Sequence, residues 1–186
     1  MKVEKRLLNP VVAAFVGMLL CAPTIMAQTE TLDRLYEELA GAEGRTAERI
    51  ERRIRSEWSK SGSPSMDLLL QRGRDAMEEG DVTLAIEHLT ALVDHAPDFA
   101  EGWNARALAY FQAGLYGPSV RDISRALALN PRHFDALTGF GRILEETERE
   151  EEALEVYESV LAIHPQLEGI RDSVERLRVK AAGQDL

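Results

Sequence analysis

The chain has 186 residues, of which 45% are hydrophobic, and a formal net charge of −10 at pH 7. This length is enough for one domain with a sizeable core, and the negative charge opposes binding to nucleic acid or to an anionic membrane surface. The single cysteine, Cys21, lies in the first 27 residues, so the remainder has no thiol for a disulfide, a nucleophile or a metal site.

Residues 1–27 have the three-part pattern of a secretory signal peptide. Basic side chains among the first six residues precede an apolar run over 11–22, and the segment ends on the small residue Ala27. The run is shorter than the roughly 20 residues of a membrane-spanning helix, which favours a cleaved signal over a retained membrane anchor. Cys21 follows Leu20, whereas the bacterial lipoprotein signal that this cysteine resembles has a small residue there. We expect cleavage after Ala27, export to the periplasm of a Gram-negative bacterium and no membrane insertion after cleavage.

Residues 28–62 are predicted to form two amphipathic helices and a linker. Apolar residues three and four apart place one stripe on each helix. The stripe residues are Leu35, Leu39, Ile50, Ile54 and Trp58. The stretch "SKSGSPSMD" then supplies Ser, Gly and Pro to interrupt the chain before Ser63 or Ser65 caps the next helix. We expect the helical pair to cap the front of the domain.

Three prolines, Pro97, Pro131 and Pro165, recur every 34 residues, and a fixed period in this range is typical of a solenoid. Shifting the sequence by 34 residues aligns large residues with large ones and small residues with small ones. The aligned small positions are Gly73, Ala107 and Gly141 on the first helix of each unit, and Ala85, Ser119 and Ala153 on the second. Small side chains there let the two helices cross closely, whereas a bulky one would overpack the crossing.

Each unit also contains its own turn signals. Gly80 and Gly114 follow the first helix in two units and allow the positive φ that ends a helix. Glu148 has the corresponding place in the third unit, so that turn is predicted to form without glycine. The proline of each unit ends the second helix because it lacks an N–H and clashes with the preceding turn.

The three units over 63–167 resemble tetratricopeptide repeats, with repeats at 66–99, 100–133 and 134–167. The central unit fits best, through Trp103, Ala107, Tyr110, Gly114, Ile123, Ala126 and Pro131. Arg72 and Arg106 depart from the leucine that is common before the small position. The resemblance implies an all-α fold, a right-handed α-solenoid of three helix-turn-helix repeats.

Residues 168–186 are predicted to form a C-terminal capping helix and a tail. Ile170, Val174 and Leu177 lie on one stripe, as expected of a helix whose apolar face covers the last repeat while its other face meets water.

No group of residues in the sequence indicates catalysis, a cofactor or a metal site. Three of the four histidines, His88, His95, His133 and His164, lie at or near the ends of second helices, where the helix dipole favours a cation. There is no zinc-helix spacing, phosphate loop or nucleophile elbow. The carboxylate run over 145–152 lacks the alternating ligands and the central glycine of a calcium loop. We therefore expect a protein that is not an enzyme.

The solenoid predicts a protein-interaction scaffold or adaptor that binds a peptide or helix in its concave groove. The first helices would point Asp67, Leu70, Arg74 and Met77, then Glu101, Asn104, Leu108 and Phe111, then Asp135, Thr138, Arg142 and Glu145 into this groove. The partner-binding residues that we select are Leu70, Arg74, Met77, Asn104, Leu108, Phe111, Thr138 and Arg142. The expected partner is a protein segment with apolar anchors and at least one acidic group, which Arg74 and Arg142 could bind with paired N–H donors.

Two alternatives stay open at this stage. Leu108 and Phe111 could simply pack against neighbouring helices, because apolar residues at helical spacing usually belong to a core. The whole chain could also be a permanent structural or biogenesis subunit of a cell-envelope assembly complex. Some tetratricopeptide domains grip a C-terminal carboxylate with a Lys and Asn clamp, but the matching places here hold Leu70, Arg74, Ala105, Asp135 and Gly139.

Overall fold

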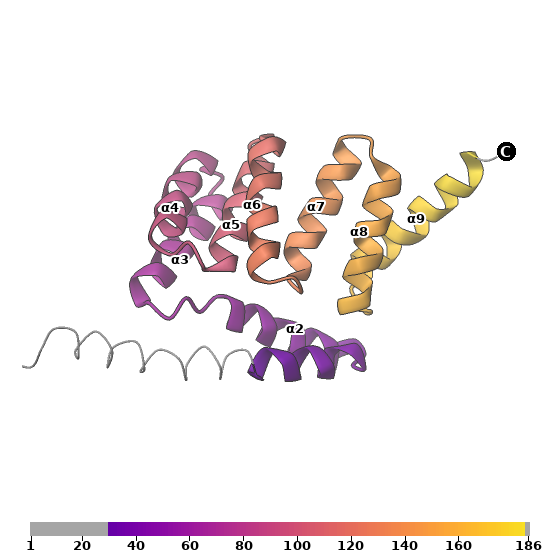
Figure 1. Cartoon of the computed structure of the whole chain (residues 1–186), viewed down its shortest axis with the longest axis horizontal. Helices are drawn as coiled ribbons and strands as arrows, with labels where there is room; N and C mark the ends of the chain where they lie inside the picture. The colour runs from indigo at the N-terminus through magenta and orange to yellow at the C-terminus, as the bar shows by residue number, and fades with distance from the viewer. Residues whose placement is uncertain (1–29, 185–186) are drawn as a thin grey trace, which may run out of the picture.

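A computed structural model describes residues 30–184, and every regular element within that range is a helix. The helices cover residues 30–40, α2 Gly44–Trp58, α3 Pro64–Glu78, α4 Val82–His95, α5 Ala100–Gln112, α6 Tyr116–Leu129, α7 Phe134–Glu146, α8 Glu150–Ile163 and α9 Glu168–Gln184. The predicted all-α solenoid is confirmed, with α3 to α8 standing side by side as three antiparallel pairs (Figure 1). Among the described residues no helix has the length and apolar character needed to cross a membrane. The predicted signal peptide lies outside the described residues.

The close helix crossings follow from the small residues at the repeated positions. A Cβ atom added to Gly73 would lie 2.5 Å from Leu89 Cγ, and one added to Gly141 would lie 2.7 Å from Tyr157 Cδ1. In the middle repeat the buried hydroxyl of Ser119 donates a hydrogen bond of 2.7 Å to the carbonyl oxygen of Ala107. The second helix of each pair therefore packs directly on the backbone of the first, as the small residues predict.

The turns inside the repeats also form as expected. Gly80 and Gly114 have φ values of 81° and 71°, in the left-handed region that glycine enters without cost. Glu148 has a φ of 59°, so the third repeat makes the same turn with a residue that carries a Cβ. The Ser63 prediction is only partly right, because Ser63 is the N-cap residue of α3 but its side chain makes no capping hydrogen bond.

The N-terminal helical pair does not cap the front of the solenoid, so that prediction is wrong. Its predicted stripe is buried, but against the third repeat and α9 rather than against α3. Figure 1 shows the pair running beneath the ends of the repeat helices, including α7 and α8. The ring of Trp58 stacks on His133 with centroids 3.9 Å apart, and the Tyr36 hydroxyl donates to the carbonyl oxygen of Arg132 at 3.0 Å. The loops between repeats, rather than the first repeat, thus provide the surface that the pair covers.

The C-terminal helix α9 covers the last repeat as predicted. Ile170, Val174 and Leu177 are buried in the same cluster as Tyr157 of α8. A separate cluster around Leu89 forms the core of the first repeat. The core therefore runs along the solenoid in segments, as expected when each repeat contacts only its neighbours.

Candidate binding groove on the concave face

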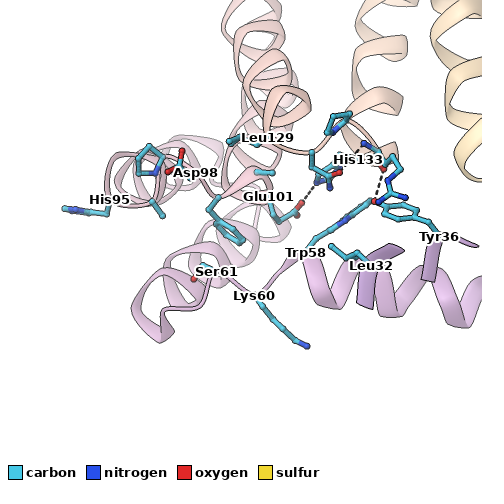
Figure 2. A pocket seen from close by; sticks show the side chains of 17 residues that line it. Leu32, Tyr36, Trp58, Lys60, Ser61, His95, Asp98, Glu101, Leu129 and His133 are labelled. Carbon is cyan, nitrogen blue, oxygen red and sulfur yellow. Dashed lines mark hydrogen bonds and ion pairs between the residues drawn. The ribbon is translucent and has the colours of Figure 1, made fainter. Parts of the chain in front are cut away.

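The described part of the chain has two sizeable hollows. One, of about 760 Å³, lies between the N-terminal helical pair and the loops that follow α4 and α6 (Figure 2). Its cations Arg132 and Lys60 are already paired, with Asp33 and Glu57 respectively. The other, of about 520 Å³, is the concave groove between α5, α7 and the start of α9. We take the groove as the candidate site because it holds the face that the repeats direct toward a ligand.

Most of the predicted partner-binding residues lie along this groove. Its lining includes Arg74, Asn104, Leu108, Phe111, Thr138 and Arg142. Leu70 is only 2% exposed and belongs to the core of the first repeat, so its selection as an accessible groove residue is wrong. Met77 is half-buried, packs against the same core and does not line the groove. The groove thus starts at the end of the first repeat and is widest over the second and third.

The apolar part of the groove consists of Leu108 and Phe111 on α5, above Ile123 of α6. Leu108 is 44% exposed, so it is available to a ligand rather than spent on packing. Phe111 is half-buried and packs on the Tyr116 ring, with centroids 5.6 Å apart. Packing therefore accounts for one face of Phe111 but not for Leu108.

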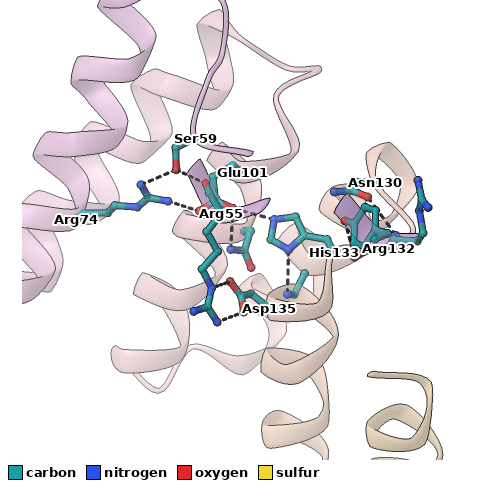
Figure 3. Close-up of polar contacts among 11 residues, drawn as sticks. Arg55, Ser59, Arg74, Glu101, Asn130, Arg132, His133 and Asp135 are labelled. Carbon is teal, nitrogen blue, oxygen red and sulfur yellow. Dashed lines mark hydrogen bonds and ion pairs between the residues drawn. The ribbon is translucent and has the colours of Figure 1, made fainter. Parts of the chain in front are cut away.

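Arg74 takes part in an internal network at one end of the groove. Its guanidinium pairs with the carboxylate of Glu101 and donates to Ser59 Oγ at 3.0 Å (Figure 3). The other Glu101 oxygen lies 2.8 Å from His133 Nε2 and accepts from Asn104 at 3.2 Å. Arg74 is therefore committed within the chain, which removes it as a donor to a ligand.

The proton positions in this network follow from its partners. His133 Nδ1 accepts the backbone N–H of Ala136 at 3.3 Å, so the ring proton is on Nε2 and is donated to Glu101. Burial by itself would raise the pKa of Glu101, but the hydrogen bond and charge of His133, together with Arg74, outweigh it and lower the pKa. Glu101 is thus held as a buried carboxylate between three donors.

A second ion pair joins the N-terminal helical pair to the groove. Arg55 of α2 donates two hydrogen bonds of 2.8 Å to Asp135 of α7 and also pairs with Glu51. The hydrogen bond to Asp135, the largest cause, raises the pKa of Arg55. The sequence gave no signal for this contact, because the two residues are 80 positions apart and belong to different kinds of segment.

Arg142 is the cation of the groove that keeps its donors free. Across the described residues Arg142 is exposed, forms no ion pair and donates no hydrogen bond. The neighbouring Glu145 accepts from the Tyr157 hydroxyl at 2.8 Å and from Arg176 of α9 at 2.5 Å. Burial, and then the adjoining Glu145 carboxylate, raise the pKa of Tyr157, so its hydroxyl remains a donor. Thr138 Oγ1, one turn before Arg142, is buried and has no partner in the described part of the chain.

The histidines are more deeply engaged than the sequence suggested. His133 and His164 are 0% and 1% exposed, and His164 Nε2 lies 3.1 Å from Glu51 of α2. Both rings therefore help to hold the N-terminal pair in place. No group of three or more potential metal ligands occurs among the described residues.

The profile of the tetratricopeptide repeat family matches residues 70–117 and 119–168, more than half of the chain. The chain belongs to the tetratricopeptide repeat family. A TPR repeat-containing protein of Rhizobium etli is 36% identical over 155 residues, which are 83% of this chain and 76% of that protein. Tetratricopeptide repeat domains generally mediate protein–protein interactions and are typically not catalytic.

Solved tetratricopeptide structures have the same helical arrangement. The Sgt2 TPR domain from Aspergillus fumigatus matches with a TM-score of 0.61 and 22% identity, over 66% of this chain and 83% of that one. The first TPR of Spaghetti (RPAP3), bound to the HSP90 peptide SRMEEVD, matches with a TM-score of 0.60 and 25% identity, over 63% and 93% of the two chains. The latter is a peptide complex of a domain with this fold.

Proposed function

We propose that this chain is a non-catalytic scaffold or adaptor that binds an extended or helical segment of another protein in its concave groove. The observation that carries the proposal is the combination of an accessible apolar side chain, Leu108, with an uncommitted cation, Arg142, in one groove. Apolar anchors flanked by a charge that sets orientation are the usual elements of peptide recognition.

The segment differs from the acidic chaperone tail that the RPAP3 domain holds. A carboxylate clamp needs cations and amides, and two of the matching places here hold Asp135 and Leu70. Asp135 is paired with Arg55 and presents a negative charge, and Leu70 is buried. The ligand that we propose therefore depends on apolar side chains for most of its affinity, with a single acidic group as the polar contact.

Export to the periplasm is part of the proposal. It rests on the pattern of residues 1–27 and on the absence of cysteine from 28–186. Amino-terminal sequencing of the protein purified from cell envelopes should begin at Gln28. An intact Met1 on protein recovered from the cytosol would contradict export.

Photo-crosslinking tests the binding function. The photoreactive amino acid p-benzoylphenylalanine is placed at Leu108 in the groove and, as a control, at the exposed Ser124 on α6. The crosslinked segment is identified by mass spectrometry, synthesised and titrated against the wild-type protein and Leu108→Ala. We expect a segment captured at Leu108 alone and at least tenfold weaker binding by the variant. Equal capture at both positions, or unchanged affinity, would contradict binding in the groove, and stoichiometric copurification with a fixed assembly would indicate a permanent subunit.

A further inference from the structure

We propose that Arg142 binds an acidic side chain of the partner segment in a notch opposite Gly169, in the way that Arg74 binds the chain's own Glu101. The inference rests on the proposed function and adds the place and the charge of one contact. It comes from comparing equivalent positions along the repeats.

The Arg74–Glu101 pair is the internal template for this contact. Glu101 lies 27 residues after Arg74, on the next first-helix along the concave face. Arg142 is at the position equivalent to Arg74, two repeats further on, and the residue 27 positions after it is Gly169. Arg142, Gly169 and the two residues that follow one turn along each helix, Glu145 and Ser173, all line the groove. The arginine is thus repeated, but the carboxylate that would meet it is missing.

The other carboxylates at this repeat position already have donors. Asp67 accepts from the backbone N–H of Ser61 at 2.8 Å and from its hydroxyl. Asp135 is held by Arg55, because Leu108 stands where a preceding arginine would be. Each of these acidic positions is therefore satisfied within the chain, and the unbalanced group on the concave face is a cation. A ligand that completes the pattern brings an anion.

The surroundings of Arg142 do not already neutralise it. The nearest carboxylate along α7, Glu145, is held by Tyr157 and Arg176. Asp172, the acidic residue one turn after Gly169, is exposed and makes no ion pair in the described part of the chain. The first turn of α9 lies at the notch, and its free N–H groups also favour a negative charge there.

Gly169 leaves the space that the ligand needs. A Cβ atom built on Gly169 meets no atom within 4 Å, and the residue has no positive φ. A side chain at this position is therefore tolerated, and Gly169→Glu should place a carboxylate opposite Arg142 as Glu101 is placed opposite Arg74. This variant would occupy the notch from within the chain, while its neutral isostere Gly169→Gln would fill the same space without charge.

The binding test uses end-blocked peptides, so that no terminal carboxylate competes. One set has ten residues with a fixed central glutamate and randomised flanks, and a twin set has glutamine at the fixed position. We expect wild-type protein to retain the glutamate set at least tenfold better than the glutamine set. That preference should vanish in Arg142→Gln and in Gly169→Glu, and remain in Gly169→Gln and in Arg72→Gln, an exposed arginine outside the groove. A preference that survives in Arg142→Gln would overturn the inference.

A second measurement needs no ligand. In nitrogen-15 spectra, the side-chain Nε–H signal of Arg142 should shift in Gly169→Glu and stay unchanged in Gly169→Gln. An unchanged signal in both variants would show that the notch does not hold a carboxylate and would overturn the inference. Loss of all peptide retention in Leu108→Ala, with glutamate preference unaffected by Arg142→Gln, would leave the proposed function standing and remove only this contact.

Discussion

Two glycines on α7 should respond in opposite directions to the same substitution. A methyl group at Gly139 would lie 3.7 Å from Ile123 Cδ1, an ordinary contact. A methyl group at Gly141 would lie 2.7 Å from Tyr157 Cδ1, about 1 Å inside the normal carbon–carbon separation. Tyr157 cannot move aside easily, because it is 1% exposed and its hydroxyl is bonded to Glu145.

The magnitudes follow from helix propensity and overpacking. Gly139→Ala should stabilise the fold by about 1 kcal/mol through helix propensity alone. Gly141→Ala gains the same amount but overpacks the crossing at a cost of about 3 kcal/mol, for a net loss of about 2 kcal/mol. Urea unfolding followed by circular dichroism measures both, and the melting temperatures should move apart by about 6–12 °C.

The middle repeat supplies the control. It combines Ala107 with Ile123 at the positions of Gly141 and Tyr157, so alanine is compatible with a slimmer partner. In a Tyr157→Ile background, Gly141→Ala should therefore cease to destabilise and gain about 1 kcal/mol. Equal effects of the two glycine substitutions, or a Gly141→Ala cost that is the same in both backgrounds, would refute the packing argument.

Three further predictions concern the turn, the N-terminal pair and acid stability. Glu148→Gly should stabilise the protein by about 1 kcal/mol in urea unfolding, because it relieves a non-glycine residue in the left-handed region; a loss of stability would contradict this. Trp58→Ala should cost about 3–5 kcal/mol, and hydrogen exchange should show faster exchange in α2 than in α4, since the stacking on His133 is lost; protected α2 amides would speak against it. Because the folded-state pKa of Glu101 lies below its ordinary value of 4.5, its contribution to stability is present above that value and is lost as the pH falls below it. Glu101→Gln should therefore lose about 3 kcal/mol at pH 7, by leaving Arg74 without its carboxylate, and show a flatter stability curve between pH 5 and 3 than wild type; parallel curves would exclude this role.

The sequence was sufficient to predict the repeats because their contacts are local and periodic. Gly73 and Leu89 meet within one helix pair, and the 34-residue period repeats that meeting, so the same small and large positions recur. The turn at Glu148 was also predictable, since the two preceding repeats have glycine there. Stripe periodicity likewise located the buried face of α9.

The tertiary structure alone decided where the N-terminal helical pair lies and which groove cations are free. An amphipathic stripe shows that Trp58 is buried but carries no information about the surface that buries it. The docking of α2 beneath the later repeats brings Arg55 to Asp135 over 80 residues of sequence, and the curvature of the solenoid brings Arg74 to Glu101. Whether a charged side chain is available to a partner depends on these pairings. Arg74 and Arg142 occupy equivalent positions and look alike in the sequence, yet only Arg142 faces a glycine where the other meets a carboxylate.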